Sequence, residues 1–230
     1  PRIGHLERVK RIFGYLVKMN DAVIRVRTEI PDYSDLPDPQ YDWSRSVYGE
    51  TSEIIPLDAP KPLGKLVRFT HYVDANLMHD VLSGKSVTGI LHIVNQTPID
   101  WYSKKQATIE TATYGSEFVA ARTCVEHAID LRNTFRYLGV PIEDSNYMFG
   151  DNKSVVDSSV TPHATLNKRH TILSFHRVRQ AIAAGVVKFY HIPGTENPAD
   201  ILSKHWGYSQ IWEILRPILF WRGDTSGCIE

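Results

Sequence analysis

The sequence predicts an α/β protein in which helices pack on a mixed sheet. Three strand-like runs with alternating apolar residues come first, at 67–75, 86–96 and 99–103. Beyond residue 111 the pattern changes, and apolar residues recur at helical spacing between short apolar strands. The resulting order is β-β-β-α-β-α-α-β-α. Three consecutive strands followed by alternating helices and strands are typical of one mixed sheet covered by helices.

Each expected element is delimited by its own pattern. In the first strand Val67, Phe69, His71 and Val73 share one face, and turn-forming residues at 95–98 separate the second strand from the third. Glycines and prolines end the helices, and Asn197 and Pro198 begin the last core helix as N-cap and first residue. We predict helices at about 112–138, 152–159, 167–184, 198–205 and 208–220, and further strands at 146–150 and 186–192.

Composition divides the chain into four parts. Residues 1–19 contain an amphipathic helix with a basic outer face, and six prolines in 20–65 predict a connector with short strands at most. We expect the folded core at 66–206, followed by a C-terminal helix and tail at 207–230. Because the chain lacks an initiator Met, we also expect it to be a piece of a longer protein.

The bulk composition excludes several classes of protein. Apolar residues make up 42% and charged residues 23%, as in ordinary globular proteins. No apolar run approaches the roughly 18 residues of a membrane span. Cys124 and Cys228 form no zinc pattern, so we expect no disulfide framework and a reducing intracellular setting. Lys plus Arg balance Asp plus Glu at 26 each, which argues against a stand-alone tight binder of nucleic acid.

Four acids stand where strands end and helices begin. Asp74 ends the first strand, Asp151 follows the strand at 146–150, and Asp200 lies in the first turn of the last core helix. Glu117 heads an apolar stripe on the long helix and therefore faces the sheet. Such acids can converge at one sheet edge, where divalent cations offset their repulsion. Oxygen ligands select Mg²⁺ or Mn²⁺, and a pair of such ions is usual for phosphodiester cleavage.

Three of these acids also have a purely structural explanation. Asp74 could be a turn or cap residue, and Asp151 could cap the next helix. Asp200 falls at the third helical position after Asn197, where an acid stabilises a helix whatever its function. A purely structural role explains Glu117 least well, because the apolar stripe that it heads faces away from water. Spacing alone therefore leaves both a metal site and a structural role open.

Several motifs resemble the ribonuclease H domain of copia-type (Ty1/copia) retrotransposon Pol polyproteins. The resemblance runs from about Leu66 to His205. Its segments, in the family's order, are YVDAN around Asp74, SVTG at 86–89, IDWYSKKQATIETATYGSEFVAAR at 99–122, GDNKSVVDSS at 150–159, KRHTILSFHRVR at 168–179 and HIPGTENPADILSK at 191–204.

The resemblance implies a ribonuclease H-like α/β fold. Its mixed five-stranded sheet would begin with an antiparallel meander of three strands and carry helices on both faces. The resemblance also implies cleavage of the RNA strand of RNA–DNA hybrids with two Mg²⁺ ions, for which Mn²⁺ could substitute. The metal ligands would be Asp74, Glu117, Asp151 and Asp200. Relatives often carry a second acid two residues after the first, where Asn76 stands in this chain.

Candidate substrate contacts flank these acids. A polar set before the long helix could contact 2′-hydroxyl groups or form a plain surface loop; it comprises Ser103, Lys104, Lys105, Gln106 and Thr108. A basic set on the 167–184 helix could contact phosphates or form a solvated face; it comprises Lys168, Arg169, His170, His176, Arg177 and Arg179. His191 is the candidate for the mobile histidine that relatives use in product release.

The resemblance also implies partners and rival functions. Residues 1–19 resemble the end of a reverse transcriptase and 20–65 its connection. We therefore expect as partners an RNA–DNA hybrid and the upstream reverse transcriptase domain of the same polyprotein, and no membrane. The expected location is cytoplasmic, in a virus-like particle, or nuclear. An integrase- or transposase-like polynucleotidyl transferase is disfavoured because the late acid is Asp200 and not a Glu. A degenerate nucleic-acid-binding copy stays open.

Overall fold

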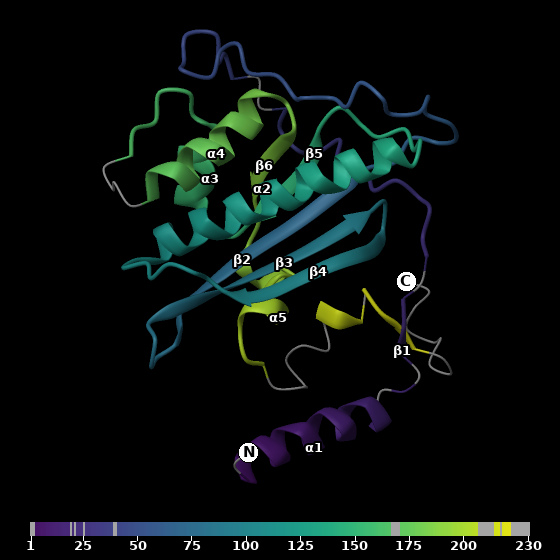
Figure 1. The fold of residues 1–230 in the computed structure, drawn as a ribbon, viewed down its shortest axis with the longest axis vertical. Helices are drawn as coiled ribbons and strands as arrows, with labels where there is room; N and C mark the ends of the chain where they lie inside the picture. Colours follow the sequence, from purple (N-terminus) through teal and green to yellow (C-terminus); the bar gives the residue numbers. More distant parts are fainter. Residues whose placement is uncertain are drawn as a thin grey trace.

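A five-stranded sheet in the order β4-β3-β2-β5-β6 forms the centre of the computed structural model (Figure 1). The structure describes residues 3–18, 20, 22–24, 26–38, 41–166, 171–206, 214–216 and 218–221. The central strands are β2 (Phe69–Asp80), β3 (Lys85–Val94), β4 (Thr97–Lys105), β5 (Asn146–Gly150) and β6 (Val187–His191). Neighbours among β2, β3 and β4 are antiparallel, whereas β5 runs parallel to both β2 and β6. The predicted mixed sheet with an antiparallel beginning is therefore confirmed.

The turn between β3 and β4 is tighter than the sequence indicates. Only Asn95 and Gln96 lie outside the strands, and Asn95 adopts a left-handed φ of 56°, which Asn tolerates better than most residues. Thr97 and Pro98 already belong to β4, where a shift of register between His92 and Ile93 accommodates the proline. The predicted four-residue turn at 95–98 is thus half strand.

Helices cover both faces of the sheet, as predicted. On one face lie α2 (Thr113–Tyr137), α3 (Lys153–Val160) and α4 (Ile172–Ala183). They enclose the main core, which includes Val73, Ile90, Phe118, Cys124, Met148, Val155, Val178 and Phe189. On the other face α5 (Asp200–Ser203) lies against Gly89 of β3, where a Cβ atom would come within 2.6 Å of the Ala199 carbonyl oxygen. Only glycine permits this close approach.

The C-terminal elements differ from the predicted ones. The Asn197 side chain accepts from the Ala199 amide at 3.1 Å and donates to the Val73 carbonyl at 2.9 Å. The chain is therefore folded into a turn there, and the helix predicted at 198–205 is regular only from Asp200 to Ser203. The helix predicted up to residue 220 is wrong at its end, because β7 (Phe220–Trp221) pairs with β1 (Ala22–Val23). The part at 207–213 lies outside the described residues.

The connector, residues 20–65, contains little regular structure but packs closely on the core. Tyr33 packs against Tyr147 of β5, with the ring centroids 4.7 Å apart and the planes tilted by 45°. Farther along, Glu53 forms ion pairs with Arg132 and Arg136 of α2, each at 2.7 Å. The connector therefore runs from one face of the sheet to the helices on the other, and Figure 1 shows it looping over one end of the domain.

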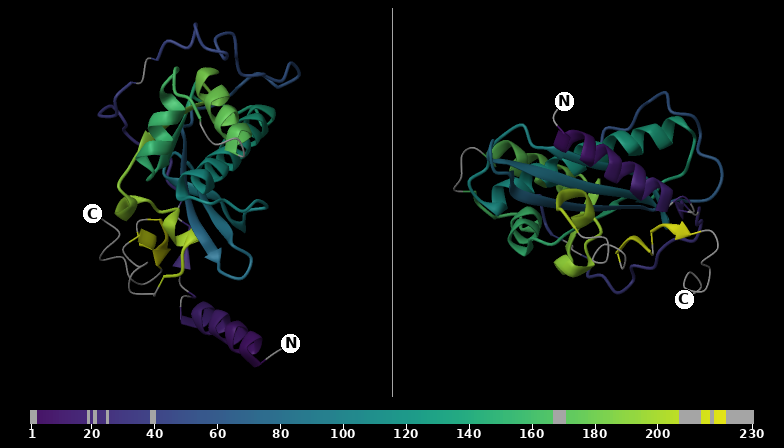
Figure 2. Two further views of the ribbon diagram at one scale, coloured as in Figure 1. Left: turned by 90° about the vertical axis from the view of Figure 1, so that its left-hand side faces the viewer. Right: turned by 90° about the horizontal axis from the view of Figure 1, so that it is seen from below.

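The first helix, α1 (Ile3–Lys18), lies apart from the sheet (Figure 2). Its apolar side chains are largely in solvent: Leu6, Val9 and Phe13 are 47–63% exposed. The amphipathic helix predicted within residues 1–19 is confirmed, with its apolar face uncovered. No described helix is long and apolar enough to cross a membrane.

Candidate metal centre

The parallel pairing of β2 with β5 ends where the acids begin. The last paired residues are Val73 and Gly150, and the next residues along the two strands are Asp74 and Asp151. Asp74 was predicted to end its strand, but β2 continues to Asp80 because it stays paired with β3. The strand that ends beside Asp74 is β5. Its end leaves the carboxylates of Asp74 and Asp151 at one open edge of the sheet.

Glu117 completes a cluster of three carboxylates. It comes from the second turn of α2, which crosses the sheet, and is only 6% exposed. One oxygen each of Asp74, Glu117 and Asp151 lies within 4.8 Å of the others, which is close enough to share one cation. They line a cleft of about 470 Å³ together with Asn152, Lys153 and Lys204 among others. The structure thus brings three of the four predicted ligands together.

Asp200 lies next to this cluster but is held differently. Its carboxylate accepts a hydrogen bond from the Lys204 ammonium, whose Nζ is also 3.4 Å from Asp74 Oδ1. Ser203, from the same short helix, donates to Asp74 Oδ2. Asp200 is therefore linked to Asp74 through two residues at the end of α5, Ser203 and Lys204.

The cluster resists full ionisation without a cation. Burial, followed by the charges of Asp74 and Asp151, raises the pKa of Glu117 well above its ordinary value. Burial likewise raises the pKa of Asp151 and, against the Lys204 hydrogen bond, that of Asp200 to about 6. Since every donor in the set is a carboxylate oxygen, the residues fit a hard divalent cation such as Mg²⁺ or Mn²⁺.

Other predicted site residues surround the acids. The exposed His191 has Nε2 3.1 Å from the Asp151 carbonyl oxygen, so it stands at the rim of the cluster. Ser103 Oγ donates to the Leu202 carbonyl at 2.5 Å, next to α5. Lys105 pairs with Asp80 at 2.7 Å. Lys104 lies over the Tyr102 ring.

Some predicted contacts are used inside the protein. Gln106 is 5% exposed, and its amide nitrogen donates to Thr88 Oγ1 and to the Ser116 carbonyl. It therefore supports the beginning of α2 and differs from the expected surface contact, whereas Thr108 is placed 3.4 Å from Glu110. In the basic set, Lys168, Arg169 and His170 lie outside the described residues.

Two members of that basic set bind other segments of the protein. Arg179 is 2% exposed and donates to the carbonyls of Ser158, Thr161 and Pro162. These carbonyls lie at the C-terminal end of α3 and in the loop after it, where the helix itself supplies no donors. His176 is exposed, as expected for a solvated face, and its Nδ1 is also hydrogen-bonded to the Tyr48 hydroxyl of the connector. Both side chains therefore hold the fold together.

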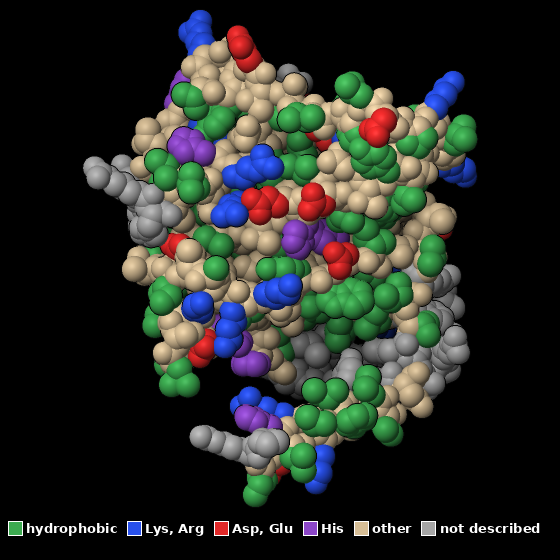
Figure 3. Space-filling model, in the orientation of Figure 1, with side chains coloured by type: hydrophobic (Ala, Val, Ile, Leu, Met, Phe, Trp, Pro, Cys, Tyr) green, Lys and Arg blue, Asp and Glu red, His purple; other side chains and the backbone are tan. Residues whose placement is uncertain are grey.

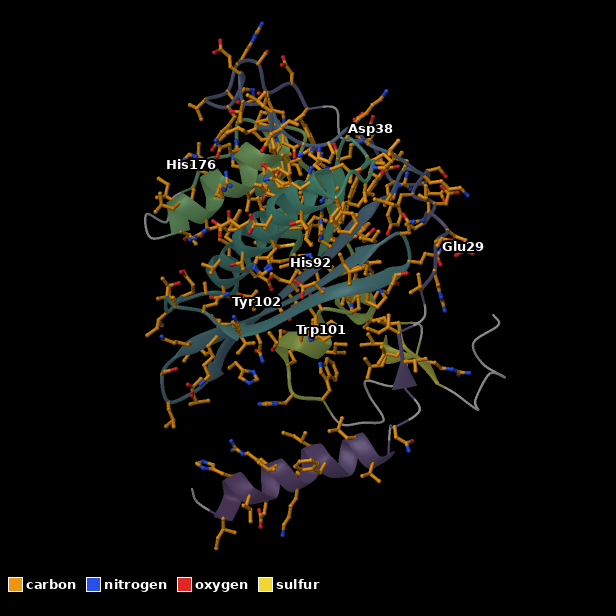
Figure 4. The ribbon with its side chains drawn as sticks, turned by 45° about the vertical axis from the view of Figure 1, so that its right-hand side comes forward. Glu29, Asp38, His92, Trp101, Tyr102 and His176 are labelled. Atoms are coloured by element: carbon orange, nitrogen blue, oxygen red, sulfur yellow. The ribbon has the colours of Figure 1, made fainter. Side chains whose placement is uncertain are left out.

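A row of three histidines, which no sequence motif indicates, lies between the sheet and α2. His71 and His92 are partners on β2 and β3, and their Nδ1 atoms are 2.8 Å apart. His92 Nε2 lies 3.3 Å from Nδ1 of His127 on α2. Figure 4 shows His92 beneath this helix, beside Tyr102 of the next strand. Strand alternation places His71 on the inner face, but no sequence pattern links it to His127.

Proton positions in this row are determined from its buried end. Arg132 donates to Asn146 Oδ1 at 2.6 Å, so the Asn146 amide nitrogen must donate to His71 Nε2 at 2.8 Å. His71 then carries its proton on Nδ1 and donates to His92, which carries its own on Nε2 and donates to His127. Burial, first among the causes, lowers the pKa of His71 well below its ordinary value and that of His92 to about 4, so both are neutral.

The direction of hydrogen-bond donation along the row argues against a separate metal site at these histidines. His92, Asp100 and His127 offer ligand atoms within 4.8 Å of one another, which resembles metal-ligand spacing. A metal would need an unprotonated Nε2 on His92. That nitrogen donates along the row instead. We therefore interpret the histidines as a buried hydrogen-bond network.

Replacing Asn146 with Asp is expected to reverse the direction of hydrogen-bond donation along the row. A carboxylate only accepts hydrogen bonds, so His71 would donate through Nε2 and His92 would keep its proton on Nδ1. Nitrogen-15 chemical shifts distinguish protonated from bare ring nitrogens. They should show the Nε2–H form of His92 in the wild type and the Nδ1–H form in Asn146→Asp. The same form of His92 in both proteins would contradict the assigned direction.

Comparisons with known proteins agree with the motifs. No protein-family model matches the chain. It is 29% identical over 133 residues to the "Retrovirus-related Pol polyprotein from transposon TNT 1-94" of Nicotiana tabacum, and 21% identical over 141 residues to that from transposon RE2 of Arabidopsis thaliana. These matches cover 58% and 61% of this chain but 10% of each relative.

Solved structures of ribonucleases H are similar to the chain at low sequence identity. The structure of LC11-RNase H1 in complex with RNA/DNA hybrid has a TM-score of 0.47 at 14% identity, covering 59% of this chain and 94% of that one. The N-terminal RNase H domain of rv2228c from Mycobacterium tuberculosis has a TM-score of 0.44 at 12% identity, covering 60% and 91%. On the sequence matches, the chain is homologous over more than half of its length to the retrovirus-related Pol polyproteins of copia-type transposons.

Proposed function

We propose that this chain is a ribonuclease H that uses divalent metal to cut the RNA strand of RNA–DNA hybrids during retrotransposon reverse transcription. One observation carries the proposal. Asp74 lies within β2, Asp151 directly follows β5 and Glu117 lies on α2, and the three converge within 4.8 Å at the positions that the family motifs indicate. Homology to transposon Pol polyproteins supports the biological setting.

The chain's own residues have separate roles in this mechanism. Asp74, Glu117, Asp151 and Asp200 would hold two Mg²⁺ or Mn²⁺ ions. Such ions supply positive charge that activates water and offsets the charge developing on the scissile phosphate. Asp74 and Glu117 are buried between the sheet and α2, so their positions are fixed before substrate binds. Asp151 stands at the more open side of the cleft.

Residues at the rim of the cleft would act on the substrate and the product. We assign to the exposed His191 a role in product release, since its ring touches the backbone of Asp151. Ser103 and Lys104 lie at the end of β4 close to α5, where they can meet the sugar-phosphate backbone of a hybrid.

The hybrid would be gripped with help from another domain. Each Lys or Arg contact to a phosphate adds salt-sensitive affinity. This chain has a formal net charge of zero, and Figure 3 shows acidic and basic side chains intermixed on the face covered by α2. We therefore expect the isolated chain to bind hybrid with a dissociation constant on the order of micromolar or weaker at physiological salt. In this proposal the upstream reverse transcriptase domain supplies the missing grip.

A cleavage assay with strand-specific labels tests the function. With Mg²⁺ or Mn²⁺ the labelled RNA strand of a hybrid should be cut, leaving 5′-phosphate and 3′-hydroxyl ends, and EDTA should stop the reaction. The DNA strand and a DNA duplex should stay intact. Nicking or strand transfer of DNA at a comparable rate would instead favour the polynucleotidyl transferase. Hybrid binding without cleavage would identify a degenerate copy.

A further inference from the structure

Lys204 places a positive charge inside the carboxylate cluster. It follows α5 directly, four residues after Asp200, to which its ammonium donates a hydrogen bond. The same nitrogen is 3.4 Å from Asp74 Oδ1. The side chain is 33% exposed, so its stem reaches the cluster from the open cleft that it helps to line.

The lysine divides the four acids into two unequal parts. Asp74, Glu117 and Asp151 have ligand oxygens within 4.8 Å of one another, and Asp200 is not a member of that group. The carboxylate of Asp200 is turned to Lys204. One part of the cluster is therefore open to a cation, while the other, between Asp74 and Asp200, already holds an ammonium group.

We infer that Lys204 is a resident cation that a second divalent ion must displace from Asp74 and Asp200. This inference rests on the proposed function. An ammonium group and a divalent ion repel each other and need the same oxygens, so they cannot occupy this part together. The first ion binds to Asp74, Glu117 and Asp151 without moving the lysine. The partly exposed stem lets Lys204 swing into the cleft when the second ion arrives.

Magnesium binding to the whole chain, without nucleic acid, tests the inference. Isothermal titration with Mg²⁺ at pH 8 should show one ion bound more tightly than a second in the wild type. In Lys204→Met the second ion should bind roughly tenfold more tightly or better, because its competitor is gone. Without metal, the same variant should unfold at a lower temperature than the wild type, since the cluster has lost its counter-charge.

Two further variants serve as controls. Lys153 lines the same cleft but pairs with Asp157 and is 69% exposed, so Lys153→Met should bind Mg²⁺ like the wild type. Lys204→Arg keeps the charge and should keep the weak second site even if Lys204→Met folds poorly. Equal affinity for the second ion in wild type, Lys204→Met and Lys204→Arg would overturn the inference while leaving the metal centre standing. Absence of any Mg²⁺ binding would overturn the proposed metal centre as well.

Discussion

Asp151→Asn is expected to lower hybrid cleavage by roughly a thousandfold or more while the protein stays folded. The change removes one oxygen ligand of the three-carboxylate group and keeps the size of the side chain. Asp151 is not part of the main core, and its pKa is raised by burial and by the charge of Asp74. Neutralising it should therefore leave the metal-free melting temperature equal or higher. Gel assays and thermal unfolding with and without Mg²⁺ measure both effects.

A surface acid from the next helix is the matched control. Asp157 lies on α3 with its side chain 56% exposed, and its direct 3.0 Å ion pair with Lys153 is weak because water surrounds both groups. Asp157→Asn should keep wild-type cleavage and the wild-type rise in melting temperature with Mg²⁺. If folded Asp151→Asn also cleaves near the wild-type rate, the assignment of the metal ligands is wrong.

Glu53→Gln is expected to destabilise the protein by about 3 kcal/mol, although Glu53 lies in the irregular connector. Its carboxylate accepts from both Arg132 and Arg136, and Arg132 is only 1% exposed. Removing the carboxylate leaves a buried guanidinium without its counter-charge. Backbone carbonyls still accept from Arg132, so we expect the lower end of the usual range. For a chain of this size the melting temperature should fall by roughly 6–12 °C.

The pH dependence of this loss follows from the direction of the pKa shift. Burial raises the pKa of Glu53, but hydrogen bonds and charge from Arg136 and Arg132 outweigh it and bring the pKa to about 2. The stabilisation is therefore complete above pH 4.5, the ordinary value, and is lost as the pH falls towards 2. The difference between wild type and Glu53→Gln should shrink across that window. Glu126→Gln, which removes an exposed pair with Arg122, should change stability by less than about 0.5 kcal/mol. A similarly small effect of Glu53→Gln would show that these buried ion pairs do not hold the connector on the core.

The sheet could be predicted from sequence because its signals are local. Alternation identifies β2 and β3, turn-forming residues mark the hairpin, and glycines mark the helix ends. The packing of the connector could not be predicted in this way. Glu53 and Arg132 are far apart in the chain, and no periodicity in either segment indicates that they pair.

The acids of the site could be predicted for a similar reason, since Asp74, Glu117 and Asp151 each follow a local pattern of strand or helix. Lys204 could not, because a lysine after a short helix is ordinary at that position. Gln106 and Arg179 were placed at the surface because polar residues are mostly exposed. Their burial depends on acceptors supplied by distant segments.

The contact between α5 and Gly89 bears on how such a protein can diverge. Alanine at position 89 would push its methyl group against Ala199 and Ser203 at 2.6–2.9 Å, so α5 would have to move away from β3. The strand itself would stay paired, because alanine is compatible with a strand. The displaced helix carries Asp200, and Lys204 follows it. Catalytic activity would therefore fall, whereas the sheet would keep its fold. A glycine codon becomes an alanine codon by one base change. A single mutation is therefore enough to leave a descendant of this sequence well folded but inactive.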